Sequence, residues 1–360
     1  MSYLSRVEKC YKQFSLNQEE LAYYARHILL PSVGLEGQRK LKASRLLIVG
    51  AGGLGCPVLQ SLSGAGVGHL TIIDGDVVSA SNLSRQWLHS IDDVGLNKAT
   101  SAKVSAESLN PYIDLTAVDD MLSEDNAKAL IESHDLVVDA TDNLDVRYLI
   151  DDVCAEVDRP WVHAALYRES SQLTVFWNQF GSNFRKLYPE PSAAPSCSGA
   201  GMLGASASFV GNLQALEAVK LITGNGKLML GELVSVNAQG LEVQRFELPD
   251  ISSPKPLLCE DKSKESKCSI SLTQLEQALS IHEPCTLVAL HQFECPSGLK
   301  TIQLSEESLL EAGIPDHLSG KVVLVCEEGV TSSVLAEAIS TFDDRAHYLV
   351  GGARALGKLA

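Results

Sequence analysis

The sequence lacks the features that mark several common classes of protein. Its 360 residues include 29 lysines and arginines against 45 aspartates and glutamates, so the basic surface of a non-specific nucleic-acid-binding protein is missing. The same acidic balance disfavours binding to anionic membrane surfaces. The longest apolar stretch, residues 202–222, is interrupted by amide and charged side chains and predicts an amphipathic helix rather than a membrane span. The N-terminus has no apolar segment of a secretory signal, so we expect a cytoplasmic protein.

The cysteines do not form the pattern of a disulfide framework. There are nine of them, scattered along the chain, so at least one has no partner within the chain. In a reducing compartment such residues are free, catalytic or buried thiols. The composition is otherwise that of a globular protein, with 45% hydrophobic and 21% charged residues. A single core rarely grows beyond roughly 250–300 residues, so the length predicts two domains.

Short apolar runs alternate with helical segments in the first half of the chain. The predicted strands lie at 46–49, 70–74, 115–118 and 136–139, with further strands at 161–164 and 173–176. The predicted helices lie within 17–42 and at 55–65, 98–109, 126–133 and 199–221. Strands that alternate with helices predict an α/β fold with a doubly wound, Rossmann-like and mostly parallel sheet.

A change of composition marks a domain boundary near residue 248. Residues 248–268 hold three prolines and four lysines with few apolar side chains, which is typical of a linker. The sequence therefore predicts a first domain at 1–247 and a small second α/β domain at 269–360. Short strands at 287–290 and 322–325 support the second assignment.

A glycine loop follows the first predicted strand. Gly50, Gly52 and Gly55 form a G-x-G-x-x-G pattern before a predicted helix. Glycines at this spacing allow a tight turn and let backbone N–H groups approach a phosphate near a helix N-terminus. Asp74 ends the next predicted strand, where a carboxylate meets a ribose hydroxyl in such folds. The pattern predicts a nucleotide site, with close packing of helix on strand as the alternative.

Three charged residues after strand ends separate one nucleotide chemistry from another. A triphosphate needs cations for the leaving pyrophosphate and a carboxylate for Mg²⁺. Arg85 and Lys98 suit the first role, and Asp142 suits the second. Each residue taken singly fits a solvated surface charge. Their common placement where doubly wound folds bind ligands argues for a shared site.

Together these motifs resemble those of the MoeB/ThiF/HesA adenylyltransferases, relatives of the ubiquitin-activating enzymes. The matching segments are G-A-G-G-L-G-C-P from Gly50, D-G-D-x-V-x-x-S-N-L-x-R-Q from Asp74 and D-A-T-D-N-x-x-x-R from Asp139, within roughly residues 15–247. The resemblance implies a homodimeric enzyme that uses ATP and Mg²⁺. Its substrate would be the C-terminal glycine of a small ubiquitin-like sulfur-carrier protein ending in Gly-Gly. Such carriers serve molybdopterin, thiamin or related biosynthesis.

The motif match also implies the residues of the nucleotide site. Catalysis would need no protein nucleophile, because attack of a carboxylate on the α-phosphate requires only positioning and charge neutralisation. Arg85, Lys98 and Asp142 would be catalytic, and Asp142 would be the metal ligand. The nucleotide-binding residues would be Gly50, Gly52, Gly53, Gly55, Asp74, Asp76, Ser81, Asn82, Arg85, Gln86, Lys98, Asp142 and Asn143.

The resemblance implies two further catalytic residues. Arg26, in Y-A-R-H-I, matches the arginine that enters the partner subunit's ATP site. Cys197, in P-S-C-S-G-A-G, matches a segment whose cysteine bonds the activated carrier in some members. A helix N-terminus after Cys197 would favour its thiolate. A small cysteine buried in the core is the alternative for this residue.

One feature of many relatives is missing from this chain. They hold a structural zinc ion with two C-x-x-C pairs, and this sequence contains no C-x-x-C. Cys259 and Cys268 lie near the second region but are too far apart for that spacing. Two cysteines without nearby histidines do not make a tetrahedral site, so we expect no structural zinc.

Residues 270–360 resemble a rhodanese-like domain. Cys326 begins a loop similar to C-x-x-G-x-[RK]-S after a predicted strand, in which backbone N–H groups would cradle a cysteine persulfide. Thr331 replaces the usual cation, and Glu327 and Glu328 add negative charge. Both changes should disfavour the thiolate. An active sulfurtransferase and a docking module that has lost activity both remain open, and we expect weak or lost activity.

Two other functions compete with ATP-dependent adenylation. An NAD-dependent oxidoreductase of Rossmann type would explain the glycine loop and Asp74, but it leaves Arg85, Lys98 and Asp142 without a role. A non-catalytic scaffold that binds a carrier is the third hypothesis. The set of ATP residues disfavours it for the first domain, while the altered loop at Cys326 favours it for the second.

Overall fold

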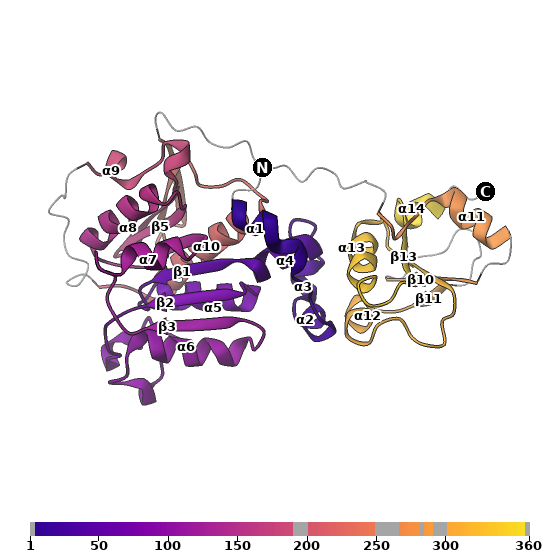
Figure 1. The fold of residues 1–360 in the computed structure, drawn as a ribbon, viewed down its shortest axis with the longest axis horizontal. Coiled ribbons are helices and arrows are strands. Elements are labelled where there is room, and N and C mark those ends of the chain that lie inside the picture. Colours follow the sequence, from indigo (N-terminus) through magenta and orange to yellow (C-terminus); the bar gives the residue numbers. More distant parts are fainter. Residues whose placement is uncertain (1–3, 190–200, 249–265, 281–283, 291–300, 357–360) are drawn as a thin grey trace. The chain divides into compact units, whose positions relative to one another are not determined.

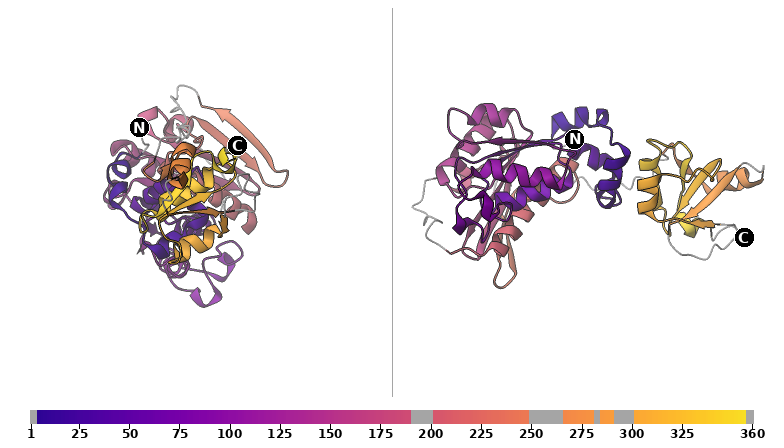
Figure 2. Two further views of the ribbon diagram at one scale, coloured as in Figure 1. Left: turned by 90° about the vertical axis from the view of Figure 1, so that its right-hand side faces the viewer. Right: turned by 90° about the horizontal axis from the view of Figure 1, so that it is seen from below.

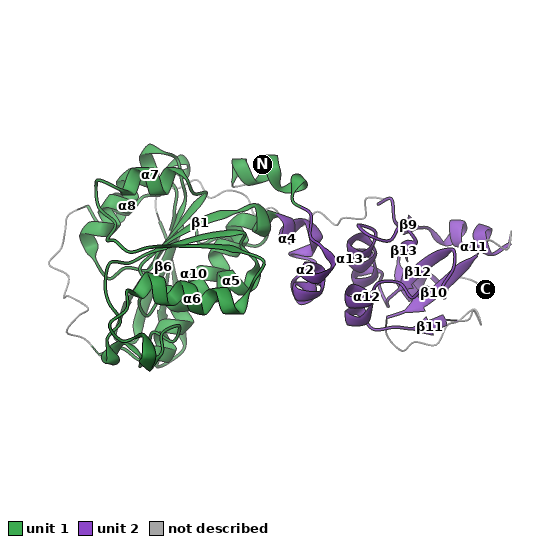
Figure 3. Cartoon of the chain, turned by 60° about the horizontal axis from the view of Figure 1, so that its bottom comes forward, with its two compact units in different colours: residues 1–14, 40–258 green, residues 15–39, 259–360 purple. Residues whose placement is uncertain are grey.

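The computed structural model describes residues 4–189, 201–248, 266–280, 284–290 and 301–356. The chain divides into two compact units (Figure 3). Unit 1 holds residues 1–14 and 40–258, and unit 2 holds residues 15–39 and 259–360. Among the described residues, no helix is both long and apolar enough to cross a membrane.

Unit 1 is built on an eight-stranded sheet with the strand order β3-β2-β1-β4-β5-β6-β7-β8 (Figure 1). The strands are β1 (Arg45–Val49), β2 (His69–Ile73), β3 (Asp114–Val118), β4 (Leu136–Asp139), β5 (Trp161–Tyr167), β6 (Ser170–Phe176), β7 (Glu232–Asn237) and β8 (Glu242–Glu247). Strands β1 to β5 pair in parallel, and β5 to β8 pair antiparallel. The expected doubly wound, mostly parallel sheet is therefore confirmed.

Helices cover both faces of this sheet. Helices α7 and α8 lie on one face, and α5, α6 and α10 lie on the other (Figures 1 and 3). The helices of unit 1 are α1 (Ser5–Cys10), α5 (Gly55–Ala65), α6 (Lys98–Leu109), α7 (Ala127–Glu132), α8 (Leu144–Glu156), α9 (Phe184–Leu187) and α10 (Gly204–Thr223). Short 3₁₀ helices are η1 (Tyr11–Gln13), η2 (Ala80–Asn82), η3 (Ile91–Asp93) and η4 (Asn178–Phe180). A core that includes Leu47, Ile131, Val137 and Trp161 fills the space beneath α7 and α8.

The antiparallel end of the sheet contains two strands that the sequence analysis did not predict. The β7–β8 hairpin forms a long two-stranded ribbon, drawn in salmon in the left view of Figure 2. Strand β8 is the edge of the sheet, and all of its residues are exposed. The alternation of apolar and polar residues that marks a half-buried strand is therefore absent there.

Unit 2 contains a parallel sheet with the strand order β11-β10-β12-β13-β9. Its strands are β9 (Ser269–Ile270), β10 (Cys285–Ala289), β11 (Thr301–Gln303), β12 (Lys321–Val325) and β13 (Ala346–Leu349). Its helices are α2 (Gln18–Tyr23), α3 (Ala25–Ile28), α11 (Leu272–Ser280), α12 (Glu306–Ala312), α13 (Val330–Ile339) and α14 (Gly352–Leu356). Helix α4 (Gly34–Ala43) contributes residues to both units. The expected small second α/β fold is thus confirmed.

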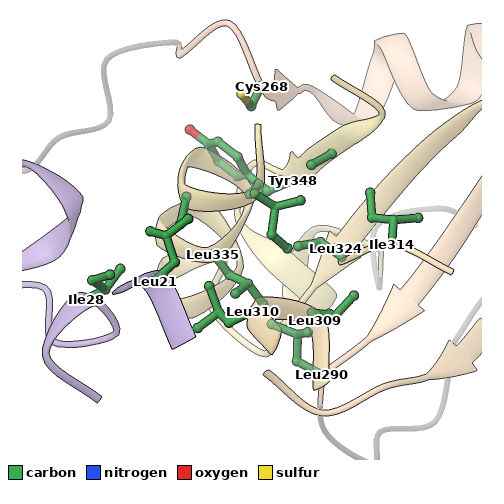
Figure 4. Close-up of a cluster of buried hydrophobic side chains, with 14 of the residues drawn as sticks. Leu21, Ile28, Cys268, Leu290, Leu309, Leu310, Ile314, Leu324, Leu335 and Tyr348 are labelled. Carbon is green, nitrogen blue, oxygen red and sulfur yellow. The ribbon is translucent and has the colours of Figure 1, made fainter. Parts of the chain in front are cut away.

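The N-terminal part of unit 2 begins with a well-capped helix. Asn17 accepts a hydrogen bond from the Glu20 backbone N–H at 2.9 Å, and the Glu20 side chain accepts one from the Asn17 N–H, which forms a capping box. Leu21 and Ile28 belong to the same buried cluster as Leu310 (Figure 4). Apolar burial, and not helix propensity alone, therefore stabilises these short helices.

Candidate active site

The carboxyl ends of β1, β2 and β4 adjoin a cavity of about 590 Å³ in unit 1. This is the edge of the sheet at which doubly wound folds bind ligands. Most of the predicted nucleotide-binding residues line this cavity. They are Gly50, Gly52, Gly53, Asp74, Asp76, Asn82, Arg85, Gln86, Lys98, Asp142 and Asn143.

Several predicted residues lie elsewhere. Gly55 begins α5 and packs against the backbone of the glycine loop instead of lining the cavity. Ser81 is exposed outside the lining, and its carbonyl oxygen accepts a hydrogen bond from Arg85 at 3.0 Å. Arg26 and Cys326 belong to unit 2. Cys197 lies outside the described residues.

The glycine loop is shaped by close approach of backbone to backbone. Gly50 has a φ of +102°, which favours glycine, and a Cβ there would lie 2.8 Å from the Ala140 carbonyl oxygen. A Cβ on Gly55 would lie only 1.9 Å from the Gly50 carbonyl oxygen. The loop is therefore held against α5 on one side and against the segment after β4 on the other.

We expect Gly55→Ala to destabilise the protein by about 3 kcal/mol, because the added methyl group has no room. Gly64→Ala is the matched control. Gly64 lies in the same helix with nothing within 4 Å of its Cβ position, so alanine should stabilise the helix by about 0.5–1 kcal/mol. Thermal unfolding of both variants measures the difference, and a Gly55→Ala protein as stable as wild type would contradict it.

Asp74 fixes the segment that follows β2. Its Oδ2 accepts a hydrogen bond from the Ala51 N–H at 2.7 Å, and its Oδ1 accepts one from the Asp76 N–H at 2.8 Å. Asn97 donates from its side chain to the Asp74 carbonyl oxygen at 2.7 Å and caps α6 by accepting from the Thr100 N–H at 2.9 Å. Carboxylate oxygens have further lone pairs, so Asp74 can also accept from a ribose hydroxyl.

Arg85 and Lys98 are two of the cations that line the cavity. Lys98 is the first residue of α6, and its largely buried Nζ lies 2.7 Å from Asp76 Oδ2. Arg85 is half-buried and donates to the carbonyl oxygen of Ser81. Hydrogen bonds to the Ser81 carbonyl oxygen and to Asp76 hold these two cationic side chains at the cavity. This arrangement suits a ligand with several negative charges.

The loop after β4 carries Asp142 and Asn143. Asn143 caps α8, because its Oδ1 accepts from the N–H groups of Asp145 at 2.9 Å and Val146 at 3.3 Å. Asp142 is exposed at the cavity and is available to a ligand. One short segment therefore positions both the start of α8 and the carboxylate of Asp142.

The residues at the cavity fit a nucleotide with a magnesium ion. Among the described residues, no group of three or more His, Cys, Asp or Glu side chains could hold a metal by itself. Mg²⁺ commonly takes one or two protein carboxylates and completes its shell with phosphates and water, so Asp142 suits an ion that arrives with a triphosphate. Gln86 Oε1 is buried without a hydrogen-bond partner in the described part of the chain, and a ligand donor could satisfy it.

Part of the cavity lining is apolar and could not be predicted from the sequence. Leu122, Leu166 and Met202 line the cavity and come from three separated segments. Apolar side chains of this kind carry no motif, because the same residues fill every core. Arg147, which also lines the cavity, had a signal as the last letter of the D-A-T-D-N-x-x-x-R segment.

Cys56 and Cys154 of unit 1 are buried. Burial raises the pKa of Cys56 to about 12 and raises that of Cys154 well above its ordinary value. Neither thiol ionises near neutral pH, so neither is a nucleophile. Cys10, Cys268 and Cys326 are also free thiols.

In unit 2, Cys326 follows β12 and precedes α13. The Ser332 N–H donates a hydrogen bond to the Cys326 Sγ at 3.3 Å. The Cys326 carbonyl oxygen accepts one from the Ala353 N–H at 2.8 Å. Gly329, with a φ of +85°, turns the chain into α13. The loop therefore has the strand–loop–helix arrangement that the sequence predicts, with a backbone N–H directed at the sulfur.

A cation that the sequence analysis did not identify lies beside this loop. Arg354 of α14 forms ion pairs with Glu327 at 3.4 Å and with Glu328 at 2.8 Å. It is 28 positions from Cys326 in the sequence (354 − 326), so the loop motif gave no sign of it. Thr331 still offers no charge, and Arg354 offsets only part of the acidic pair.

Arg26 projects from α3 with 79% of its side chain exposed. It forms an ion pair with Glu307 of α12, which is 55% exposed. Ion pairs this exposed contribute roughly 0–1 kcal/mol, so the contact does not commit Arg26 to one position.

Solved structures with this fold include PaaA and E. coli MccB. PaaA is 25% identical with a TM-score of 0.57, over 65% of this chain and 76% of that chain. E. coli MccB crystallised with ATP is 21% identical with a TM-score of 0.55, over 66% of this chain and 74% of that chain. The MccB likeness shows the fold alone.

Sequence comparison finds relatives that match much more of the chain. A probable adenylyltransferase/sulfurtransferase MoeZ of Mycobacterium tuberculosis is 36% identical over 96% of this chain and 94% of its own length. An adenylyltransferase and sulfurtransferase MOCS3 of Anopheles gambiae is 37% identical over 77% of this chain and 65% of its own length. The sequence model of the ThiF family matches residues 24–259. The chain therefore belongs to the ThiF family.

Proposed function

We propose that this protein is an ATP-dependent adenylyltransferase that activates the C-terminal glycine of a small ubiquitin-like sulfur-carrier protein ending in Gly-Gly. The observation that carries the proposal is the meeting of Arg85, Lys98 and Asp142 at one cavity beside a glycine loop. An NAD-dependent oxidoreductase would leave these three residues without a role. The names of the MoeZ and MOCS3 relatives support both adenylation and sulfur transfer.

The cavity residues divide into those that bind the nucleotide and those that manage its charge. Asp74 suits a ribose hydroxyl, the glycine loop suits phosphate oxygens, and Gln86 offers a buried acceptor. Arg85 and Lys98 compensate negative charge on the phosphates. Mg²⁺, held by Asp142 and the triphosphate, supplies further neutralisation of phosphate charge when it is bound.

The reaction is a displacement at the α-phosphorus. An oxygen of the carrier's terminal carboxylate forms a bond to the α-phosphorus, and the bond from that phosphorus to the bridging oxygen breaks. The products are a carrier acyl-adenylate and pyrophosphate, which leaves with the bonding electrons. Arg85 and Lys98 stabilise the charge that develops on the leaving group, and no proton transfer to the protein is required.

The proposal also includes the compartment, the oligomeric state and the pathway of the enzyme. We infer a cytoplasmic homodimer in which Arg26 enters the partner subunit's ATP site and in which Cys197 is a candidate for a bond to the activated carrier. The free thiols suit a reducing compartment. The pathway would be molybdopterin, thiamin or related sulfur delivery, with the domains divided as 1–247, a linker at 248–268 and 269–360.

Intact-mass spectrometry tests the reaction directly. The full chain is mixed with ATP, MgCl₂ and purified Gly-Gly-ended carriers, each paired with a control that lacks the last glycine. We expect one carrier to gain the mass of AMP and its truncated control to stay unchanged. No adduct on any carrier, with a folded protein, would overturn the proposal.

We propose that residues 269–360 form a rhodanese-like domain whose Cys326 carries sulfur as a persulfide, with weak activity toward thiosulfate. We expect Thr331→Arg to raise the thiosulfate:cyanide sulfurtransferase rate about tenfold, because a cation near the sulfur stabilises the negative charge that sulfur transfer places there. The double variant Thr331→Arg/Cys326→Ala is the control and should be inactive. A wild-type rate that is already high at pH 7 and is unchanged by Thr331→Arg would show that the backbone N–H groups suffice.

A further inference from the structure

A buried polar cluster lies at the base of the loop that carries Asp142. Asp139 ends β4 with no exposed surface, and His163 of the neighbouring strand β5 is 1% exposed. The two residues are register partners in the parallel β4–β5 pair, and His163 Nδ1 lies 2.9 Å from Asp139 Oδ2. Arg147 of α8 places its Nε 3.2 Å from the same oxygen.

Burial and neighbouring groups determine the charge states of His163 and Asp139. Burial lowers the pKa of His163, so the imidazole is neutral and donates through its Nδ1–H. Burial alone would raise the pKa of Asp139, but the charge of Arg147 and the hydrogen bond from His163 bring it below its ordinary value. Asp139 is therefore a carboxylate that only accepts hydrogen bonds.

The carboxylate of Asp139 links His163 to the cavity. Its Oδ1 accepts from the Thr141 N–H at 3.0 Å and from the Thr141 hydroxyl at 2.7 Å. Both oxygens belong to one planar carboxylate. The donors at Oδ2, His163 and Arg147, therefore also fix the position of Oδ1 and of Thr141, which is hydrogen-bonded to Oδ1. Arg147 reinforces this by donating to the Thr141 carbonyl oxygen at 2.6 Å. Thr141 and the adjacent Asp142 both line the cavity.

The His163 ring is itself held in place. Three aromatic rings surround it, with centroid distances of 5.5 Å to Trp161, 5.7 Å to Phe176 and 5.4 Å to Phe184. Gln214 of α10 donates to the Asp139 carbonyl oxygen at 2.6 Å and fixes the end of β4. The loop therefore starts from a rigid base.

We propose that His163 is a positioning residue for adenylation, which acts through Asp139 to hold segment 141–143 so that Asp142 stays at the triphosphate end of the nucleotide site. This inference rests on the proposed function. An imidazole suits the task because it is a rigid donor that a packed apolar core can hold. His163 touches no part of the cavity and would act only through its neighbour.

Calorimetric titration of the full chain with ATP, with and without MgCl₂, tests this role without a carrier. We expect Mg²⁺ to tighten ATP binding by wild type. His163→Phe keeps an aromatic ring but removes the donor, and it should lose about tenfold of this Mg²⁺-dependent gain, as loss of a supporting hydrogen bond behind a metal ligand does. His163→Asn places an amide nitrogen where Nδ1 lies and should retain most of the gain.

His134→Phe is the matched control. His134 is also buried, bonds to the Thr71 hydroxyl at 2.8 Å and does not line the cavity. The His134→Phe variant should lower the melting temperature and leave the Mg²⁺-dependent gain in ATP affinity unchanged. Should His163→Phe fail to fold, His163→Gln replaces it, because the glutamine amide nitrogen matches the Nε2 position and not the Nδ1 position that faces Asp139.

The outcomes separate the two proposals. A donor-free variant at His163 that keeps the full Mg²⁺ effect would overturn the positioning role, as would a His163→Asn protein that loses as much as the donor-free variant. ATP binding by wild type that Mg²⁺ does not change would overturn it as well. Wild type that binds ATP with Mg²⁺ but adenylates no carrier would overturn the proposed function, and the titrations would still report separately whether His163 positions Asp142 for Mg²⁺-dependent ATP binding.

Discussion

Lys98→Ala should lower carrier-dependent ATP–pyrophosphate exchange by about a thousandfold, the loss expected when a preorganised charge is removed from a transition state. Lys98 is largely buried at the cavity, and Asp76 holds its Nζ at 2.7 Å. Alanine removes the cation but leaves the start of α6 intact, because Asn97 caps that helix through the Thr100 N–H. The fold should therefore survive the loss of activity.

Lys103→Ala is the control for this result. Lys103 lies on the same helix, away from the cavity, and pairs with Glu107 at 3.5 Å. Its replacement should leave the exchange rate within about twofold of wild type, since surface pairs of this kind contribute little. Near-normal exchange in Lys98→Ala, at wild-type melting temperature, would show that the pyrophosphate site is assigned wrongly.

Arg26→Ala should inactivate the homodimer to a similar degree, if Arg26 completes the ATP site of the partner subunit. Mixing the inactive Arg26→Ala and Lys98→Ala proteins should restore activity. A heterodimer has one site that receives Arg26 from the Lys98→Ala subunit and keeps its own Lys98. Random exchange of subunits should restore about a quarter of the wild-type activity, because half of the dimers are then mixed and each has one complete site.

Glu307→Ala is the control for Arg26. It removes the exposed ion pair seen within unit 2 and leaves Arg26 in place, so activity should stay near wild type. Subunit exchange is followed with differently tagged proteins. If mixed dimers form and show no exchange activity, Arg26 does not act across the dimer.

The parts of the fold that the sequence predicted share one property. Strands β1 to β4 are short runs bounded by turns, and their alternation with helices predicts a doubly wound parallel sheet. In a parallel sheet the carboxyl ends of the strands meet at one edge, so the sequence alone predicts that the glycine loop, Lys98 and Asp142 lie together. The structure brings all of them to one cavity.

The features that sequence reasoning missed depend on contacts between distant segments. Leu166 and Met202 line the cavity as ordinary apolar residues, and Arg354 reaches the Cys326 loop from another helix. His163 lies in a run that predicts only a buried strand, so its bond to Asp139 needed the register of β4 and β5. These contacts leave no local pattern, because the two partners are set by packing rather than by spacing.

The most direct test of the central claim is ATP–pyrophosphate exchange by the full chain against a panel of Gly-Gly-ended sulfur carriers. Exchange reports the reversible formation of an acyl-adenylate and nothing downstream of it. We expect Mg²⁺-dependent ATP–pyrophosphate exchange with at least one carrier. Deletion of that carrier's terminal glycine should abolish the exchange. Exchange that is absent with every carrier while the protein is folded, or that proceeds equally well without any carrier, would contradict it.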